Sequence, residues 1–352
     1  MATTTQFNPN ADLNRVLLDA GASKTVYALV TPETERAKAA VFGDADGPRR
    51  QAYLDQFREA WTSKQDRIHE DFFHSWHGWS APVVDLDRKL FPFHYPTAGA
   101  SEALRHLIYD FSRRYTRTMA PPLIHVFEGE YEGYKAMAEA AGVEIMEWSR
   151  DDWRLLVERL NYGQMGWNHL VFLSQPSAID GNVWKDCNEF LASITMPNCV
   201  VMDVTYVGAI PEGAVNERFN LNLPCVRNVV FSLSKPFGLY YDRVGGVFCR
   251  EEDMGLFGNK WFKNLTSLSL GTIMMERSDV FAMATKYAEQ QKLAVAMISA
   301  RLGITLTPSD VFILATAESA PDVAMDAYLR RPATGKLRLC LTPDMAKQIG
   351  TV

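Results

Sequence analysis

The sequence has little cysteine, no long basic run and no long apolar run. Its five cysteines among 352 residues are scattered and include no C-x-x-C pair, which argues against a disulfide framework and a thiolate zinc site. No stretch reaches the roughly 18 apolar residues that a membrane helix needs. The first ten residues are polar and lack the charged-then-apolar pattern of a signal peptide. These absences favour a cytoplasmic enzyme without a membrane partner.

The sequence also lacks a concentration of positive charge. Lys+Arg number 36 against Asp+Glu 42, for a formal net charge of −6, and basic residues cluster only in pairs such as Arg113-Arg114. A nucleic-acid partner is therefore not expected, because phosphate contacts need a concentrated positive face. At roughly 150 residues per domain, the length fits one large domain and a smaller one.

From about residue 90 the sequence alternates between apolar runs of strand length and helical patterns. Buried strands are predicted at Leu123–Phe127, His169–Leu173, Cys199–Met202, Asn228–Phe231 and Gly245–Phe248. Helices are predicted at Ser101–Phe111, Tyr131–Ala141, Asp151–Leu160 and Trp184–Ile194. This alternation predicts an α/β fold with a mostly parallel sheet between helices, in which ligands bind at the carboxyl ends of the strands.

Both ends of the chain differ from this central part. The first 64 residues are typical of helices, broken at Thr31-Pro32 and at residues 43–48. One long helix is predicted over Ser278–Gly303, then strands at 311–315 and 336–341 and a helical turn from Pro343. The predicted organisation is an N-terminal helical segment, 1–65, a large α/β domain, 66–275, and a connecting helix with a small α+β domain, 276–352.

The sharpest local pattern surrounds Lys235, in the segment Ser232-Leu-Ser-Lys-Pro-Phe-Gly directly after a predicted strand. Partial desolvation lowers a lysine pKa and favours the neutral amine that can form a Schiff base. The alternative is a solvated loop lysine. A second apolar strand ends at Asp203, with Tyr206 three residues later, so that an acid and a phenol could contact a ring ligand. Alternatively, Asp203 only caps a turn.

A third pattern is the small-residue loop Thr97-Ala-Gly99-Ala100-Ser101, which opens a predicted helix. Backbone N–H groups at a helix N-terminus, together with a serine hydroxyl, form an anion site. The alternative is that Ser101 caps the helix and does nothing more.

In this order the three patterns resemble the fold-type I pyridoxal 5′-phosphate (PLP) enzymes of the class I/II aminotransferase family, from about Phe93 to Leu341. The resemblance implies that Lys235 forms the Schiff base with PLP and moves the proton of the substrate Cα. It implies that Asp203 pairs with the pyridine nitrogen and that Tyr206 hydrogen-bonds the phenolic oxygen of the ring.

The same resemblance implies roles for the remaining candidates. Gly99, Ala100 and Ser101 would hold the phosphate at the helix N-terminus, and Ser232 and Arg243 would complete its site. Tyr131 would stack on the ring, with Tyr134 as the alternative. Arg338, in the segment Lys-Leu-Arg-Leu-Cys-Leu, would grip the substrate α-carboxylate.

Two features depart from the family pattern. The family carries Asn-Pro-x-Gly after the strand at His169–Leu173, whereas this sequence has Ala178 and Ile179 at the first two positions. Asn182 or Gln175 could stand in for the missing asparagine. The chain also ends 14 residues after Arg338, short of the terminal helix that such enzymes usually have. Both departures weaken the expectation of routine transamination.

The leading hypothesis is a PLP-dependent aminotransferase acting on an α-amino acid and a 2-oxo acid, assembled as a homodimer. The runner-up keeps PLP but ends in elimination, replacement, cyclisation or decarboxylation. The third is a non-catalytic relative that binds PLP or a partner. No metal is expected, because His69 and His74 are five residues apart and cannot share a helix face. The aromatics from Phe72 to Trp79 are expected in the core or at a subunit contact, where one of them, or His77, could reach the partner's site.

Overall fold

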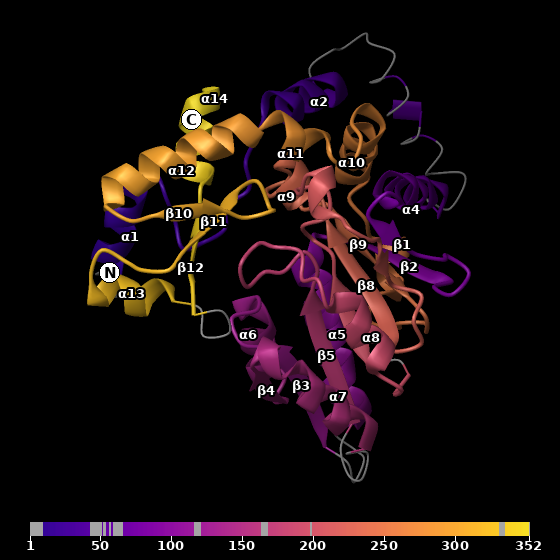
Figure 1. Cartoon of the computed structure of the whole chain (residues 1–352). Coiled ribbons are helices and arrows are strands. Elements are labelled where there is room, and N and C mark those ends of the chain that lie inside the picture. Colours follow the sequence, from indigo (N-terminus) through magenta and orange to yellow (C-terminus); the bar gives the residue numbers. More distant parts are fainter. Residues whose placement is uncertain are drawn as a thin grey trace, which may run out of the picture.

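The structure is a computed structural model that describes residues 10–42, 51, 54–55, 58, 66–115, 121–162, 168–197, 199–330 and 335–351. Its centre is a seven-stranded sheet with the order β2-β9-β8-β6-β5-β3-β4 (Figure 1). The strands are β2 (Phe93–Thr97), β3 (Pro122–Phe127), β4 (Glu144–Trp148), β5 (Asn168–Ser174), β6 (Val200–Asp203), β8 (Val226–Ser232) and β9 (Gly245–Cys249). All neighbouring pairs are parallel except those that β9 makes with β2 and β8.

Helices cover both faces of this sheet, because successive side chains of its inner strands pack into different cores. On β5, Leu170 and Phe172 belong to one apolar cluster, while Val171 and Leu173 belong to the other. The first cluster is closed by α5 (Ala100–Tyr115) and α6 (Glu132–Ala140). The second is closed by α4 (Asp66–Ser80), α7 (Trp153–Tyr162), α8 (Cys187–Ser193) and α10 (Leu265–Arg277). Burial on both faces explains why the strands read as continuous apolar runs.

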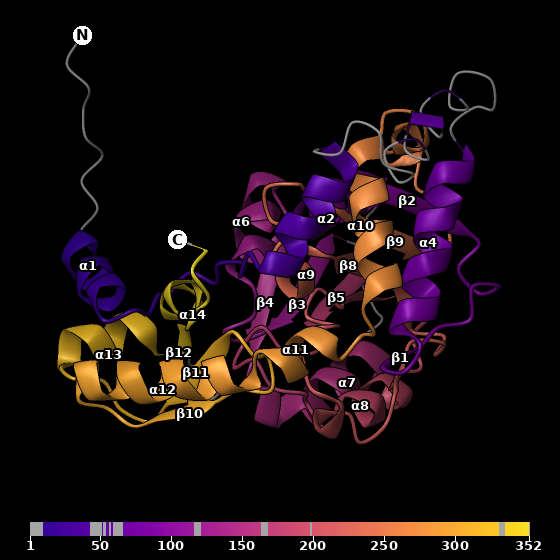
Figure 2. The same cartoon turned by 90° about the horizontal axis from the view of Figure 1, so that it is seen from above.

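A second, antiparallel sheet lies to one side of the large one (Figure 2). Its strands are β10 (Leu306–Pro308), β11 (Leu314–Ala317) and β12 (Leu337–Cys340). Beside it are α1 (Ala11–Asp19), α12 (Ala288–Leu302), α13 (Val323–Leu329) and α14 (Thr342–Ile349). Ser23 bridges to Cys340, which attaches the N-terminal segment to β12 before α2 (Pro32–Phe42) crosses to the side of α10. The remaining elements include a two-stranded pair, β1 (Val84–Asp85) with β7 (Phe219–Asn220).

The five strands predicted for the large sheet are confirmed to within two residues at each end. Of the two strands predicted near the C-terminus, 336–341 matches β12, whereas 311–315 begins three residues before β11 and ends two residues too early. The single helix predicted over Ser278–Gly303 is wrong, because α11 (Ala282–Lys286) and α12 are separated at Tyr287. The Tyr287 hydroxyl donates to Glu33 Oε2 at 2.7 Å, and its ring stacks on Phe312, so tertiary contacts break the helix there. Sequence reasoning also missed β2, β4 and β10, and it shortened α14 to one turn. The domain boundaries stay predictions, and the one at 65 lies outside the described residues.

All five cysteines are free and buried. Within the described parts of the chain, no helix combines the length and the apolar character needed to cross a bilayer.

Gly238 joins the large sheet to the N-terminal segment. It follows α9 (Ser234–Phe237) with φ +69°, and an added Cβ would lie 2.3 Å from the carbonyl oxygen of Leu29. We expect Gly238→Ala to lower the free energy of unfolding by about 3 kcal/mol or more, from left-handed strain and overpacking together. Gly142 has φ +66° and open space around it, so Gly142→Ala should cost only about 1–2 kcal/mol. Equal losses in urea denaturation would contradict the close approach.

Candidate functional site

A cavity of about 410 Å³ lies at the carboxyl ends of β5, β6 and β8. Its wall combines these strand ends with β12, α13 and the N-terminal segment at residues 24–26. The predicted site residues that line it are Ala100, Ser101, Tyr131, Asp203, Tyr206, Ser232, Lys235, Arg243 and Arg338. Gly99, the remaining predicted residue, stands behind Arg243. Residues from five separate parts of the sequence therefore meet in one hollow.

Lys235 reaches the cavity because β8 ends at Ser232 and α9 begins at once. Its Nζ donates to the carbonyl oxygen of Val26 at 2.6 Å, a contact between positions 209 residues apart. Burial, together with the nearby guanidinium groups of Arg338 and Arg243, lowers the pKa of Lys235 to about 8. A buried amine with this pKa is neutral for a useful fraction of the time near neutral pH.

Asp203 ends β6, lines the same cavity as Lys235 and is held by three hydrogen bonds. Its carboxylate accepts hydrogen bonds from the Tyr134 hydroxyl at 3.0 Å, from Thr205 N at 3.0 Å and from Thr205 Oγ1 at 2.5 Å. Burial raises the pKa of Asp203 above its ordinary value. Of the two tyrosines considered for the ring face, Tyr131 lines the cavity, and Tyr134 stands behind Asp203. Burial also raises the pKa of Tyr206 to about 12, so its hydroxyl stays protonated as a donor.

The opposite end of the cavity has the features of an anion site. Gly99 has φ +75° directly before α5, and a Cβ there would lie 2.9 Å from Arg243 Nη2. That guanidinium nitrogen donates to the carbonyl oxygen of Ala98 at 2.7 Å, which holds the Arg243 side chain across the N-terminus of α5. The hydroxyls of Ser232 and Ser234 lie 2.8 Å apart on the same wall. Helix N–H groups, hydroxyls and a guanidinium together suit a phosphate group.

Arg338 is the second arginine of the cavity, and its guanidinium group has an N–H donor without a partner among the described residues. Its side chain is buried, and Nη1 donates to the carbonyl oxygen of Ala178. Its Nε has no hydrogen-bond partner among the described residues. A buried guanidinium with an unpaired N–H fits a carboxylate, because the planar fork of an arginine binds two oxygens at once.

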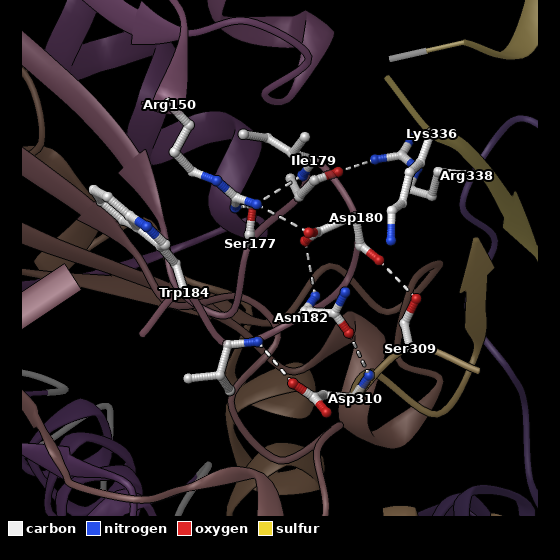
Figure 3. A network of polar contacts seen from close by, with 12 residues as sticks. Arg150, Ser177, Ile179, Asp180, Asn182, Trp184, Ser309, Asp310, Lys336 and Arg338 are labelled. Atoms are coloured by element: carbon white, nitrogen blue, oxygen red, sulfur yellow. Dashed lines mark hydrogen bonds and ion pairs between the residues drawn. The ribbon is translucent and has the colours of Figure 1, made fainter. Parts of the chain in front are cut away.

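The turn between β5 and α8 carries Ala178 and is fixed to the smaller sheet (Figure 3). Arg150 pairs with Asp180 at 3.0 Å, and Ser309 Oγ donates to the carbonyl oxygen of Asp180 at 2.6 Å. Gln175 is bonded at both ends of its amide to the backbone of Trp184, and the Asn182 amide oxygen accepts from Asp310 N. Neither Gln175 nor Asn182 is among the residues that line the cavity.

Glu130 is the residue that sequence reasoning missed. It lines the cavity but is only 6% exposed, and its carboxylate accepts from Ser174 N at 3.1 Å and from Ser174 Oγ at 2.6 Å. Burial, with the nearby Asp203 carboxylate adding to it, raises the pKa of Glu130 to about 7. Ser174 ends an apolar strand just as Asp203 does, so its place was open to prediction. No pattern around Glu130 signals its burial.

The histidine and aromatic motifs of α4 lie away from this cavity. Phe72, Phe73 and Trp76 pack against Phe231 in the core, so of the two alternatives the structure places them in the core. The side chain of His77 is bonded to the carbonyl oxygen of Leu86 at 2.8 Å.

His69 groups with Glu70 and His94 instead of with His74, which brings three potential metal ligands together. Lys263 Nζ lies 2.9 Å from His69 Nδ1, and Arg88 pairs with Glu70 at 3.2 Å. These neighbouring cations disfavour a bound metal ion.

Comparison with known proteins shows the fold. No protein-family model and no curated protein matches the sequence. Histidinol-phosphate aminotransferase from Sinorhizobium meliloti, in complex with PLP, matches with TM-score 0.61 and 14% identity, over 99% of this chain and 95% of that chain. YbdL from Escherichia coli, with a methionine aminotransferase function, matches with TM-score 0.61 and 14% identity over 100% of both chains. The PLP-bound C-S lyase from Staphylococcus hominis matches with TM-score 0.61 and 11% identity, over 99% and 95%. The predicted fold class is thereby confirmed.

The raised pKa of Glu130 predicts a pH dependence of stability. Between its unfolded value of 4.5 and its folded value of about 7, the folded state keeps a proton that the unfolded state has lost. The stabilisation from this group is therefore complete below pH 4.5 and is lost as pH rises through 7. Glu130→Gln lacks this loss. Its free energy of unfolding should therefore rise relative to that of the wild type by roughly 3 kcal/mol between pH 4.5 and pH 8.

Urea denaturation at several pH values measures this difference. Glu139→Gln, an exposed site on α6, is the matched control and should track the wild type at every pH. A difference between Glu130→Gln and the wild type that does not change with pH would show that Glu130 ionises normally in the folded protein.

Proposed function

We propose that the cavity binds PLP and that the protein transfers an amino group between an α-amino acid and a 2-oxo acid. The observation that carries the proposal is the buried Lys235 amine, with its lowered pKa, in one cavity with the Asp203 carboxyl group and two guanidinium groups. The fold shared with PLP-bound enzymes supports it.

The residues present fit this cofactor. Lys235 would attach to the aldehyde, and the N-terminus of α5 with Ser101 and Arg243 would hold the phosphate. The fit at the phosphate end depends on Gly99, because any Cβ there would push against the Arg243 guanidinium. Asp203 would face the ring nitrogen, and Tyr131 would lie against the ring.

PLP, when bound, supplies the electron sink that stabilises negative charge at the substrate Cα. The chain's own groups do the rest. The neutral Nζ of Lys235 would accept the proton of the substrate Cα and deliver it to the former aldehyde carbon of the cofactor, a task that needs a base with a pKa near the working pH. Asp203, which is held by hydrogen bonds from Tyr134 and Thr205, would keep a proton on the ring nitrogen. Arg338 orients the substrate by its carboxylate, which selects the bond at Cα that reacts.

A second candidate function keeps PLP and the same base but ends in elimination, replacement, cyclisation or decarboxylation. It is favoured by Ala178, which lines the cavity without a side-chain donor. The likeness of fold to a C-S lyase is compatible with it. A homodimer and a cytoplasmic location stay predictions of the sequence.

Product analysis separates the two functions. The PLP-loaded protein is mixed with single amino acids in the absence of a 2-oxo acid. Transamination predicts one equivalent of 2-oxo acid per subunit, no ammonia, and further turnover only after an acceptor is added. Continuous turnover without a 2-oxo acid acceptor would favour the second candidate instead, with release of ammonia indicating elimination and release of carbon dioxide indicating decarboxylation.

Lys235→Ala should abolish turnover in either case and remove the visible absorbance of the bound cofactor. Lys292→Ala, at an exposed position on α12, is the matched control and should keep both. Turnover that survives Lys235→Ala would overturn both enzyme functions.

Arg338→Ala tests the carboxylate assignment. Removing one partner of a buried charge pair should lower kcat/KM for α-amino acids by about 100-fold or more, with a raised KM. The amine that corresponds to the substrate without its carboxylate should react equally with the wild type and the variant. An equal fall for the two compounds would mean that Arg338 has a structural role only.

A further inference from the structure

The Ser174 hydroxyl is the meeting point of three polar groups. Its oxygen accepts a hydrogen bond from Ala178 N at 2.7 Å and lies 2.6 Å from Glu130 Oε2. The backbone N–H of Ser174 donates to the other oxygen of Glu130 at 3.1 Å. Glu130, Ser174 and Ala178 all line the cavity, and Ser174 is the register neighbour of Asp203.

The direction of the bond between Glu130 and Ser174 depends on where one proton lies. A hydroxyl has one proton to donate and two lone pairs to accept with. When Glu130 is ionised, the Ser174 hydroxyl must donate its single proton in a hydrogen bond to the carboxylate. When Glu130 is protonated, its own O–H donates to Ser174 Oγ, which then accepts from both Glu130 and Ala178 N.

In the second arrangement both lone pairs of Ser174 Oγ are occupied and its own proton is free of Glu130. That proton is then available to an acceptor atom in the cavity, which Ser174 lines. We propose that Glu130 and Ser174 form a proton-switched hydrogen-bond donor in the cavity wall, which binds an acceptor atom of the ligand only while Glu130 is protonated. The inference rests on the proposed function, because the ligand used to test it is PLP.

The groups around Glu130 hold its pKa near neutral pH, where the carboxyl group can exist with or without its proton. Asp203 on β6 contributes negative charge, which favours the protonated form, and the buried position adds to this. The other titratable or charged groups that face Glu130 or line its cavity are Lys24, Tyr131, Glu132, Tyr134, Cys187, Tyr206, Lys235, Tyr240, Arg243, Tyr328 and Arg338. Burial raises the pKa of Tyr134, Tyr206 and Cys187, so these three stay neutral, and burial lowers the pKa of Lys235 to about 8.

The test is the dissociation constant of PLP at pH 6 and pH 8.5 for four proteins: Glu139→Gln, Glu130→Gln, Ser174→Ala and the Glu130→Gln/Ser174→Ala double variant. The titrations of PLP and of Lys235 are common to all four and cancel in ratios. Glu130→Gln imitates the protonated state at every pH, because the glutamine amide N–H donates to Ser174 Oγ.

At pH 6 Glu130→Gln should bind PLP as the Glu139→Gln control does. At pH 8.5 it should bind about three- to tenfold more tightly than the control, which is the worth of one hydrogen bond. In the Ser174→Ala background most of this gain should vanish, which shows that the effect passes through the serine proton and not only through the charge of Glu130.

Three results would overturn the proposal. The first is a ratio between Glu130→Gln and the control that is the same at both pH values. The second is an equal gain with and without Ser174, which would assign the effect to charge alone. The third is that the control does not bind PLP, and in that case the proposed function falls as well. Binding of PLP combined with either of the first two results overturns the switch and leaves the proposed function intact. If Ser174→Ala does not fold, Glu130→Gln alone still decides the pH dependence.

Discussion

The pairing of β5, β6 and β8 is the constraint on which the cavity depends. In register, Ser174 lies beside Asp203, and Asp203 lies beside Val230, so the polar residues that end these strands share one edge of the sheet. The carboxyl ends of parallel strands lie at the same edge of the sheet, so the polar groups that follow them gather there. Lys235 follows within one turn of α9. A slip of one residue in any of these pairs would turn Asp203 into the core.

The smaller sheet and the N-terminal segment complete what the large sheet begins. Ser23 pairs with Cys340 through both of its backbone groups, at 3.0 and 2.7 Å, and this pairing carries Val26 over Lys235. The strand that receives Ser23 also carries Arg338. The same contact therefore buries the lysine, which lowers its pKa, and attaches the strand that brings the Arg338 guanidinium to the same cavity. Burying a single unpaired charge costs free energy. The cavity holds cationic groups whose charge a bound anionic ligand would balance.

Much of this arrangement was predictable, and the exceptions share a cause. The apolar runs located the strands, and the strand ends pointed to Asp203 and Lys235, because the rule that ligands bind at carboxyl ends acts locally on each strand. The break at Tyr287 was not predictable, since it depends on a hydrogen bond to Glu33, 254 residues away. Glu130 was not predicted as a site residue for the same reason, namely that its environment depends on residues distant in the sequence. Its burial and raised pKa come from Ser174 and Asp203, on strands that its own sequence neighbourhood does not reveal.

Reductive trapping tests the central claim most directly. The protein is mixed with PLP, reduced with borohydride so that the cofactor is fixed to the amine that holds it, and digested for peptide mass mapping. The account predicts a pyridoxyl group on the peptide that contains Lys235, at close to one per subunit. Modification spread over exposed lysines, or no modification, would contradict the claim that this cavity is a PLP site built around Lys235.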